Sequence, residues 1–147
     1  MRLAQHIETR IHTGDATDTV TLDYEARFLR RKRLVSDAGE PFLVELAETR
    51  SLNQGEGFRL DDGRIIAVMA AAEPLLAVRH GNLARIAWHV GNRHTPCQIA
   101  DDHILIREDK VLQAMLEGLG ASVTQVTAPF TPEGGAYGHG RTHGHEH

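Results

Sequence analysis

The chain has 147 residues, of which 41% are hydrophobic and 24% are charged, and its formal net charge is −4 at pH 7. This length suits one ordinary domain or two small ones, and the hydrophobic share excludes a wholly disordered chain. The negative charge gives no indication of binding to nucleic acid or to an anionic membrane. Neither a run of about 18 apolar residues nor a signal segment occurs, so we expect a cytoplasmic protein.

Residues 1–73 show the pattern of a small all-β domain. Apolar and polar residues alternate at 20–24 and again at 42–46, which is the period of half-buried strands. Asp61-Asp62-Gly63-Arg64 separates two further apolar runs, and Asp-Gly is typical of a tight hairpin turn. We expect a β-sandwich or an open barrel of short strands.

Four consecutive basic residues, Arg30-Arg31-Lys32-Arg33, lie between the first two strand-like runs. They fit either a patch that binds nucleic acid or an acidic partner, or a solvated strand, where cationic side chains prevent edge-to-edge aggregation. The run has no interleaved aromatic residues and the chain has no net positive charge, which favours the solvated strand. We therefore expect no nucleic-acid partner.

After Glu73-Pro74 the pattern changes to alternating strands and helices. Strand-like runs occur at 75–78, 97–100, 104–106 and 123–126, and helical periodicity occurs at 82–91 and 109–119. Asp109 is placed to cap the second helix and Gly120 to end it. The order β-α-β-β-α-β predicts a ferredoxin-like domain over residues 74–130, with one sheet covered by two helices. The expected fold class is therefore α+β.

The stretch Trp88-His89-Val90-Gly91-Asn92-Arg93-His94-Thr95-Pro96 is typical of a helix end. We expect Gly91 and Asn92 to stop the helix, and Pro96 to prevent its continuation. His94 then lies in a short polar connection, where its ring can coordinate a ligand or remain solvated. Taken alone, the stretch favours a solvated histidine, because isolated motifs have a high false-positive rate.

Ten histidines occur in the chain, and four of them, His139, His143, His145 and His147, follow residue 138. Residues 131–147 are rich in glycine and poor in apolar residues, so we expect a flexible tail. Histidine-rich tracts are typical of metal binding, and imidazole suits Ni²⁺, Zn²⁺ and Cu²⁺. Because flexible ligands must be ordered on binding, such a tail favours capture and release of a metal over a closed structural site.

The remaining candidate residues are weaker. His89 lies about 140° around a helix from His94, so both cannot face one ion from a regular helix. Cys97 could reach a metal near His94, but a lone cysteine in an apolar strand is more often a small buried residue. The glycine motifs of nucleophile elbows, phosphate loops and dinucleotide sites are absent from the sequence, which argues against common enzyme classes.

Three segments of the chain resemble one known family. Residues 87–99, AWHVGNRHTPCQI, resemble the xHLGNRHxPxQI segment of the UreE family of urease accessory metallochaperones. Residues 110–116, KVLQAML, resemble that family's DHVLxxML helix, and residues 129–137, PFTPEGGAY, resemble its PFxPExGAY segment, which a histidine-rich tail follows.

This resemblance implies a β domain followed by a ferredoxin-like domain, and a homodimer formed through the second domain. It implies that His94 is the metal ligand of the GNRH segment and that the two copies of it meet at the dimer axis. It also implies delivery of nickel to apo-urease together with a GTPase partner. Lys110 stands where the family has a histidine, so a secondary metal site on that helix is not carried over.

We therefore expect a non-enzymatic nickel metallochaperone, with His94 and the four tail histidines as ligands and with Zn²⁺ or Cu²⁺ able to bind at the same place. Two alternatives remain open. One is a histidine-rich buffer or store for nickel or zinc. The other is a small metalloenzyme that uses His94 with Asp101 or Asp102. No membrane partner is expected.

Overall fold

A computed structural model of the chain describes residues 1–12 and 14–134. The chain divides into a first compact unit, Met1–Ala71, and a second unit that begins at Ala72. Glu73-Pro74, where the sequence pattern changes, lies inside a strand of the second unit. No helix in the described part of the chain is both long enough and apolar enough to cross a membrane.

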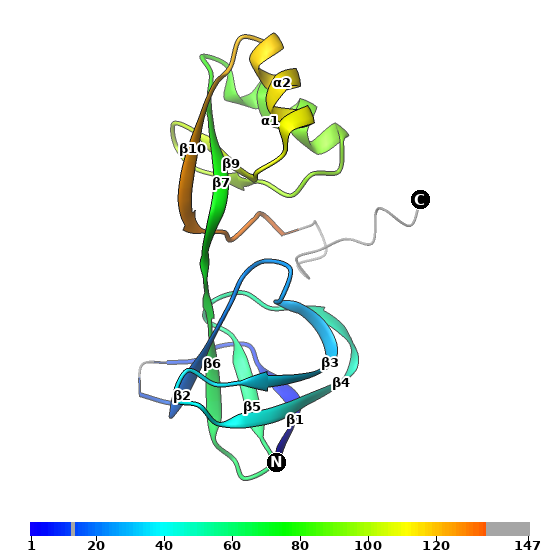
Figure 1. The fold of residues 1–147 in the computed structure, drawn as a ribbon, viewed down its shortest axis with the longest axis vertical. Helices are drawn as coiled ribbons and strands as arrows, with labels where there is room; N and C mark the ends of the chain where they lie inside the picture. The colour runs from blue at the N-terminus through cyan, green and yellow to red at the C-terminus, as the bar shows by residue number, and fades with distance from the viewer. Residues whose placement is uncertain (13, 135–147) are drawn as a thin grey trace. The chain divides into compact units, whose positions relative to one another are not determined.

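The first unit consists of one six-stranded sheet that curls into a half-barrel (Figure 1). Its strands are β1 (Arg2–Glu8), β2 (Asp18–Leu22), β3 (Phe28–Val35), β4 (Pro41–Ser51), β5 (Gly57–Leu60) and β6 (Ile65–Ala70). They are arranged in the order β2-β6-β5-β1-β4-β3. The prediction of an open barrel is therefore closer to the structure than the prediction of a sandwich, because a single curled sheet, and not a pair of facing sheets, encloses the core.

The core of the half-barrel comes from alternate residues of these strands. Phe42 and Val44 of β4, Phe58 of β5, and Ile66 and Val68 of β6 are all almost completely buried. The β5–β6 hairpin forms at the predicted Asp-Gly turn, where Gly63 takes a positive φ of 90°. The basic run Arg30–Arg33 lies on β3, which confirms the solvated strand favoured above. Sequence analysis missed β1, since this strand buries only Ala4 and shows no clear apolar alternation.

Arg27 is buried in the turn between β2 and β3 with a relative exposure of 1%. Its Nε donates a hydrogen bond to the Leu52 carbonyl and its Nη1 donates one to the Leu22 carbonyl, both at 3.0 Å. The guanidinium also lies over the Tyr24 ring, 5.9 Å from its centroid. One side chain thus joins two loops that are far apart in the sequence. Tyr24, predicted as a strand residue, belongs to this turn.

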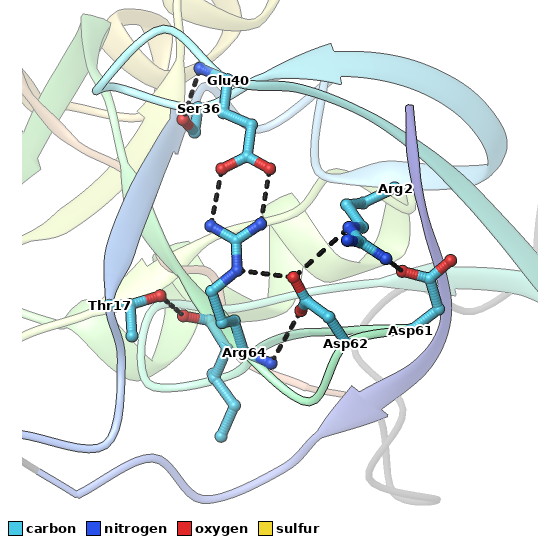
Figure 2. A network of polar contacts seen from close by, with 8 residues as sticks. Arg2, Thr17, Ser36, Glu40, Asp61, Asp62 and Arg64 are labelled. Carbon is cyan, nitrogen blue, oxygen red and sulfur yellow. Dashed lines mark hydrogen bonds and ion pairs between the residues drawn. The ribbon is translucent and has the colours of Figure 1, made fainter.

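An ion-pair network joins the β5–β6 turn to the β3–β4 turn (Figure 2). Arg64 donates two hydrogen bonds to the Glu40 carboxylate, at 2.7 and 2.6 Å, and its Nε donates one to Asp62 at 2.8 Å. Arg2 of β1 pairs with both Asp61 and Asp62. The hydrogen bonds from Arg64 lower the pKa of Glu40 below its usual value of 4.5.

The second unit contains β7 (Ala72–Arg79), α1 (Leu83–Asn92), β8 (Gln98–Ile99), β9 (Ile104–Arg107), α2 (Lys110–Gly118) and β10 (Ser122–Pro129). This is the predicted element order. The four strands form a sheet in the order β10-β7-β9-β8, and all paired neighbours are antiparallel. β8 is shorter than the predicted strand at 97–100, because only two of its residues pair with β9.

Both helices pack on the same face of this sheet. Leu76 and Val78 of β7 lie opposite Ile106 and Ile104 of β9, and the same core cluster holds buried residues of both helices. These helix residues are Ile86 and Val90 of α1 and Leu112 and Leu116 of α2.

Signals in the local sequence predict where α2 begins and most of the residues that it buries. Asp109 caps α2 as predicted, since its carboxylate accepts a hydrogen bond from the Leu112 N–H at 3.0 Å. Val111 is one of the apolar residues in the predicted helix at 109–119, yet it is 69% exposed. The reason is that the buried stripe of α2 follows Leu112 and Leu116, which lie four residues apart.

The buried guanidinium provides a test of the first unit. We expect Arg27→Met to lower the free energy of unfolding by about 2–4 kcal/mol, because two buried carbonyls lose charged hydrogen-bond donors. Urea unfolding followed by circular dichroism measures the change. Arg10→Met removes an exposed arginine of the same unit and should leave the transition within about 0.5 kcal/mol of the parent. Equal midpoints for Arg27→Met and the parent would contradict the structural role of Arg27.

The Glu40–Arg64 pair predicts a dependence of stability on pH. The folded-state pKa of Glu40 lies below its unfolded value, so its contribution is present above about pH 4.5 and is lost as pH falls through the folded pKa. Glu40→Gln should therefore be less stable than the parent at pH 7, and the difference should shrink under acid conditions. Denaturant midpoints between pH 3 and 7 measure this, with Glu48→Gln as an exposed control. A difference that does not change with pH would exclude the ion pair as its source.

Candidate metal-binding site

His94 lies immediately beyond the C-terminal end of α1, where the backbone turns toward β8. The prediction that Gly91 and Asn92 stop the helix is wrong, since α1 continues through Asn92 and Arg93 is its C-cap. His94 instead takes the left-handed conformation, with φ of 58°, and no other non-glycine residue of the described chain has a positive φ. The side chain of His94 is exposed.

Two hydrogen bonds place His94 in this conformation. The His94 N–H donates to the Gly91 carbonyl at 2.9 Å, and the Thr95 N–H donates to the Val90 carbonyl at 3.3 Å. This pair is the Schellman arrangement, in which a left-handed residue closes the helix and satisfies its last carbonyls. Gly91 can stay helical because the stop is made three residues later.

α2 ends in the same arrangement with a different residue at the key position. Gly120 has φ of 90°; its N–H donates to the Glu117 carbonyl, and the Ala121 N–H donates to the Leu116 carbonyl, both at 3.0 Å. Glycine takes this conformation without steric cost, whereas a residue with Cβ pays about 1–2 kcal/mol. A histidine held where glycine is favoured indicates that its side chain serves a purpose other than ending the helix.

The chain returns to this connection after β10. Phe130 is fully buried, the Thr131 N–H donates to the Gln98 side chain at 2.9 Å, and the Glu133 N–H donates to the Cys97 carbonyl at 2.8 Å. The first residues of the predicted flexible tail, 131–133, are therefore fastened to the connection that follows His94, so the prediction of a flexible tail from residue 131 is wrong at its start. The tail histidines themselves, His139, His143, His145 and His147, lie outside the described residues.

Cys97 has the environment of a small, partly buried residue. Burial, and then the charge of Glu133, raise the pKa of the Cys97 thiol. Since the thiolate is the form that binds metals, these effects weaken Cys97 as a ligand.

The other histidines of the second unit have structural surroundings. His80 accepts a hydrogen bond at Nδ1 from the Asn82 N–H, at 2.9 Å, and its Nε2 lies 3.2 Å from the Leu119 carbonyl, so both ring nitrogens are used. His89 is half-buried, and its ring meets Trp88 edge-on at 5.0 Å. His103 Nδ1 lies 2.6 Å from Asp102, and this hydrogen bond lowers the pKa of Asp102.

Within residues 1–12 and 14–134, no three histidine, cysteine or carboxylate side chains come together in a geometry that could hold a metal ion. Asp102, one of the two carboxylates that the metalloenzyme alternative offers, is engaged with His103. Of the predicted ligands, the described chain thus contains His94 alone. Its left-handed backbone and the contact between Cys97 and Glu133 escaped sequence analysis. No local signal marks that contact, which joins residues 36 positions apart.

Comparison with known proteins covers both units of the chain. A family model described as the C-terminal domain of the UreE urease accessory protein matches residues 73–147, and one described as its N-terminal domain matches residues 2–71. The chain is 57% identical over 136 residues to the urease accessory protein UreE of Ruegeria pomeroyi, an alignment that covers 92% of this chain and 91% of the relative.

Two further relatives with the same name agree. The protein of Rhodobacter capsulatus is 61% identical over 132 residues, covering 90% of this chain and 84% of the relative. The protein of Paracoccus denitrificans is 63% identical over 123 residues, covering 84% of this chain and 79% of the relative. With both halves matched in order, the chain belongs to the UreE family of urease accessory proteins.

Proposed function

We propose that this chain is a nickel metallochaperone, which binds Ni²⁺ through His94 and passes it to apo-urease. The observation that carries the proposal is the exposed His94 ring, held in a left-handed helix stop where glycine would be more stable. Membership of an accessory family of urease, whose assembly needs nickel, agrees with an imidazole ligand. Ni²⁺ is the cargo in this proposal, and Zn²⁺ or Cu²⁺ would compete for the same ligand.

The tail histidines are the proposed source of further ligands. Gly134 follows the residue fastened to Cys97, and His139 is five residues farther on, a span of up to about 17 Å when extended. Cys97 is in turn three residues from His94. The chain is therefore long enough for His139, and with it the other tail histidines, to reach the ion at His94. Ligands from a segment of this length would leave the ion exchangeable.

We further propose a homodimer in which His94 of each copy contributes to one site on the two-fold axis. A ferredoxin-like plan for the second unit is supported by its strand order β10-β7-β9-β8 with both helices on one face. The proposed partners are the urease accessory GTPase and the apo-urease maturation complex, and the proposed location is the cytoplasm. The tail alone would suit a metal buffer, so transfer of nickel to apo-urease separates chaperone from buffer.

His94→Gly and His94→Ala separate the role of the ring from that of the backbone. Both variants should dimerise, lose the tight nickel site and fail to support urease activation at limiting nickel. His94→Gly should raise the free energy of unfolding by about 0.5–1 kcal/mol, because glycine relieves the left-handed backbone, while His94→Ala should stay within about 0.5 kcal/mol of the parent.

Calorimetric nickel titration, urea unfolding and a urease activation assay measure these outcomes, with His89→Ala as the matched control. The affinity of the parent should fall as the pH is lowered, since a protonated imidazole cannot bind metal. A His94→Gly protein that binds nickel as tightly as its parent and still activates urease would refute the proposal.

Removal of residues 138–147 tests whether His94 and the tail histidines have separate roles as ligands. The shortened protein should bind fewer nickel ions than the parent but keep one tight site per dimer, because His94 and all of the described fold remain. Equilibrium dialysis with analytical ultracentrifugation gives both the ion count and the oligomeric state. Complete loss of nickel binding would show that the tail supplies the essential ligands.

A further inference from the structure

Three of the four edge strands in the described sheets carry features that discourage pairing with a further strand. β3 carries the four basic residues, and β8 is only two residues long. Along β2, the Asp37 N–H donates to the Thr19 carbonyl at 2.8 Å, and the Asp37 carboxylate accepts hydrogen bonds from the Thr19 and Thr21 hydroxyls. Charge, short length and cover are the usual means by which proteins protect an edge strand.

β10, the fourth edge strand, lacks all three of these features. It is eight residues long, with the sequence SVTQVTAP, and none of these residues is charged. β7 is its only strand partner in the described sheet, and Figure 1 shows β10 along the outer side of the second unit. The chain is held beyond β10 by the buried Phe130 and by the hydrogen bond from Thr131 to Gln98. The second unit therefore has one long, uncharged edge.

Two prolines show which backbone groups of β10 face away from β7. Pro74 of β7 pairs with Thr127, and Pro129 of β10 lies two residues farther along in the same register. Proline has no N–H, so neither residue can belong to a pair that exchanges both hydrogen bonds. Because the two kinds of pair alternate along antiparallel strands, the N–H and C=O groups of Val123, Gln125 and Thr127 point away from β7.

We propose that the β10 edge pairs with β10 of a second copy of this chain, antiparallel and about a two-fold axis at Gln125. In this register Gln125 lies opposite Gln125 of the second copy, and Val123 lies opposite Thr127 of the second copy. Each pair exchanges two N–H···O=C hydrogen bonds, because both members present these groups to the open side. The two four-stranded sheets then form one continuous sheet, with the helices of both copies on the same face.

Charge and symmetry favour a second copy as the occupant of this edge. A symmetric antiparallel pair places β10 against itself, so that any charge near the axis would meet its own like charge, and β10 carries none. The β-branched side chains of Val123 and Thr127 suit a paired strand. A charged segment of another protein would find no opposite charge on β10 to select it.

This interface is separate from the one proposed at His94. β10 and β8 are opposite edges of a four-stranded sheet, about 14 Å apart at the usual spacing of strands. His94 lies in the connection that leads to β8, so one two-fold axis cannot pass through both places. The smallest closed assembly that uses both interfaces is a tetramer. The inference does not rest on the proposed function, because β10 contains no proposed ligand.

Sedimentation equilibrium of the full-length protein over a range of concentrations, with and without nickel, tests the pairing. Gln125→Lys places two lysines opposite each other at the axis and should weaken self-association through β10 about fivefold or more. Gln5→Lys makes the same change at an exposed residue of β1, which has strand partners on both sides, and should associate as the parent does. Equal association of Gln125→Lys and the parent would overturn the proposal.

Nickel titration separates this proposal from the one for His94. Gln125→Lys should bind nickel as the parent does, whereas His94→Gly should lose the tight nickel site and keep the association through β10. Loss of β10 association together with unchanged nickel binding is therefore the result expected for Gln125→Lys. Removal of residues 138–147 should leave the β10 association unchanged, and its loss on removal would overturn pairing between the two strands alone.

A mixing experiment identifies a second copy as the occupant. Gln125→Glu by itself should associate as weakly as Gln125→Lys, since like charges again meet at the axis. An equimolar mixture of the two variants should recover the association of the parent, because each lysine then lies opposite a glutamate. A mixture that associates no better than either variant alone would overturn the two-fold axis at Gln125.

Gln125→Pro, compared with Gln125→Ala, tests whether the contact is made by backbone pairing. Proline removes an N–H that faces the open edge, so the fold should tolerate it, and urea unfolding checks this. The proline variant should associate about tenfold more weakly than the alanine variant, since the two central hydrogen bonds are lost. Equal association of two folded variants would overturn strand pairing.

Discussion

The turn that ends α1 is the constraint on which the proposed site depends. Hydrogen bonds from the backbone N–H groups of His94 and Thr95 close the helix and send the chain into β8, so the position of His94 is determined by main-chain geometry. Its conformation costs free energy that glycine would save, as the equivalent turn of α2 demonstrates with Gly120. A fold selected for stability alone would carry glycine at both turns, which makes the histidine informative about function.

The connection that follows this turn also joins two distant parts of the sequence. β8 is only two residues long, yet its pairing with β9 and its contacts with residues 131 and 133 hold the end of the described chain beside it. In the proposed function, the two fixed His94 rings of the dimer supply the tight site, and the tail histidines supply ligands that exchange. This combination is suited to an ion that has to be handed on, because a closed set of rigid ligands would retain it.

The first unit achieves stability by a different route. The described residues of its half-barrel form no helix, and polar side chains in the turns join strands that the sheet leaves apart. These are Arg27 in the β2–β3 turn, and Arg64 with Glu40 between two hairpins. The buried cation is satisfied by carbonyls, and the exposed pair is bidentate, which is the favourable geometry for arginine. The four basic residues of β3 lie on the last strand of this sheet, where positive charge protects an edge against self-association.

Sequence patterns by themselves determined the family, the α+β class, the order of elements in the second unit and the cap at Asp109. These features depend on neighbours within a few residues, where periodicity and capping chemistry are decisive. Only the tertiary structure decided that His94 is left-handed, that Cys97 meets Glu133, that Arg27 is buried and that β3 is an edge. Each of these features depends on contacts between residues remote in the sequence or on competition between whole segments. Gly91, for example, remains helical because a later residue closes the turn. Local patterns carry no information about such choices.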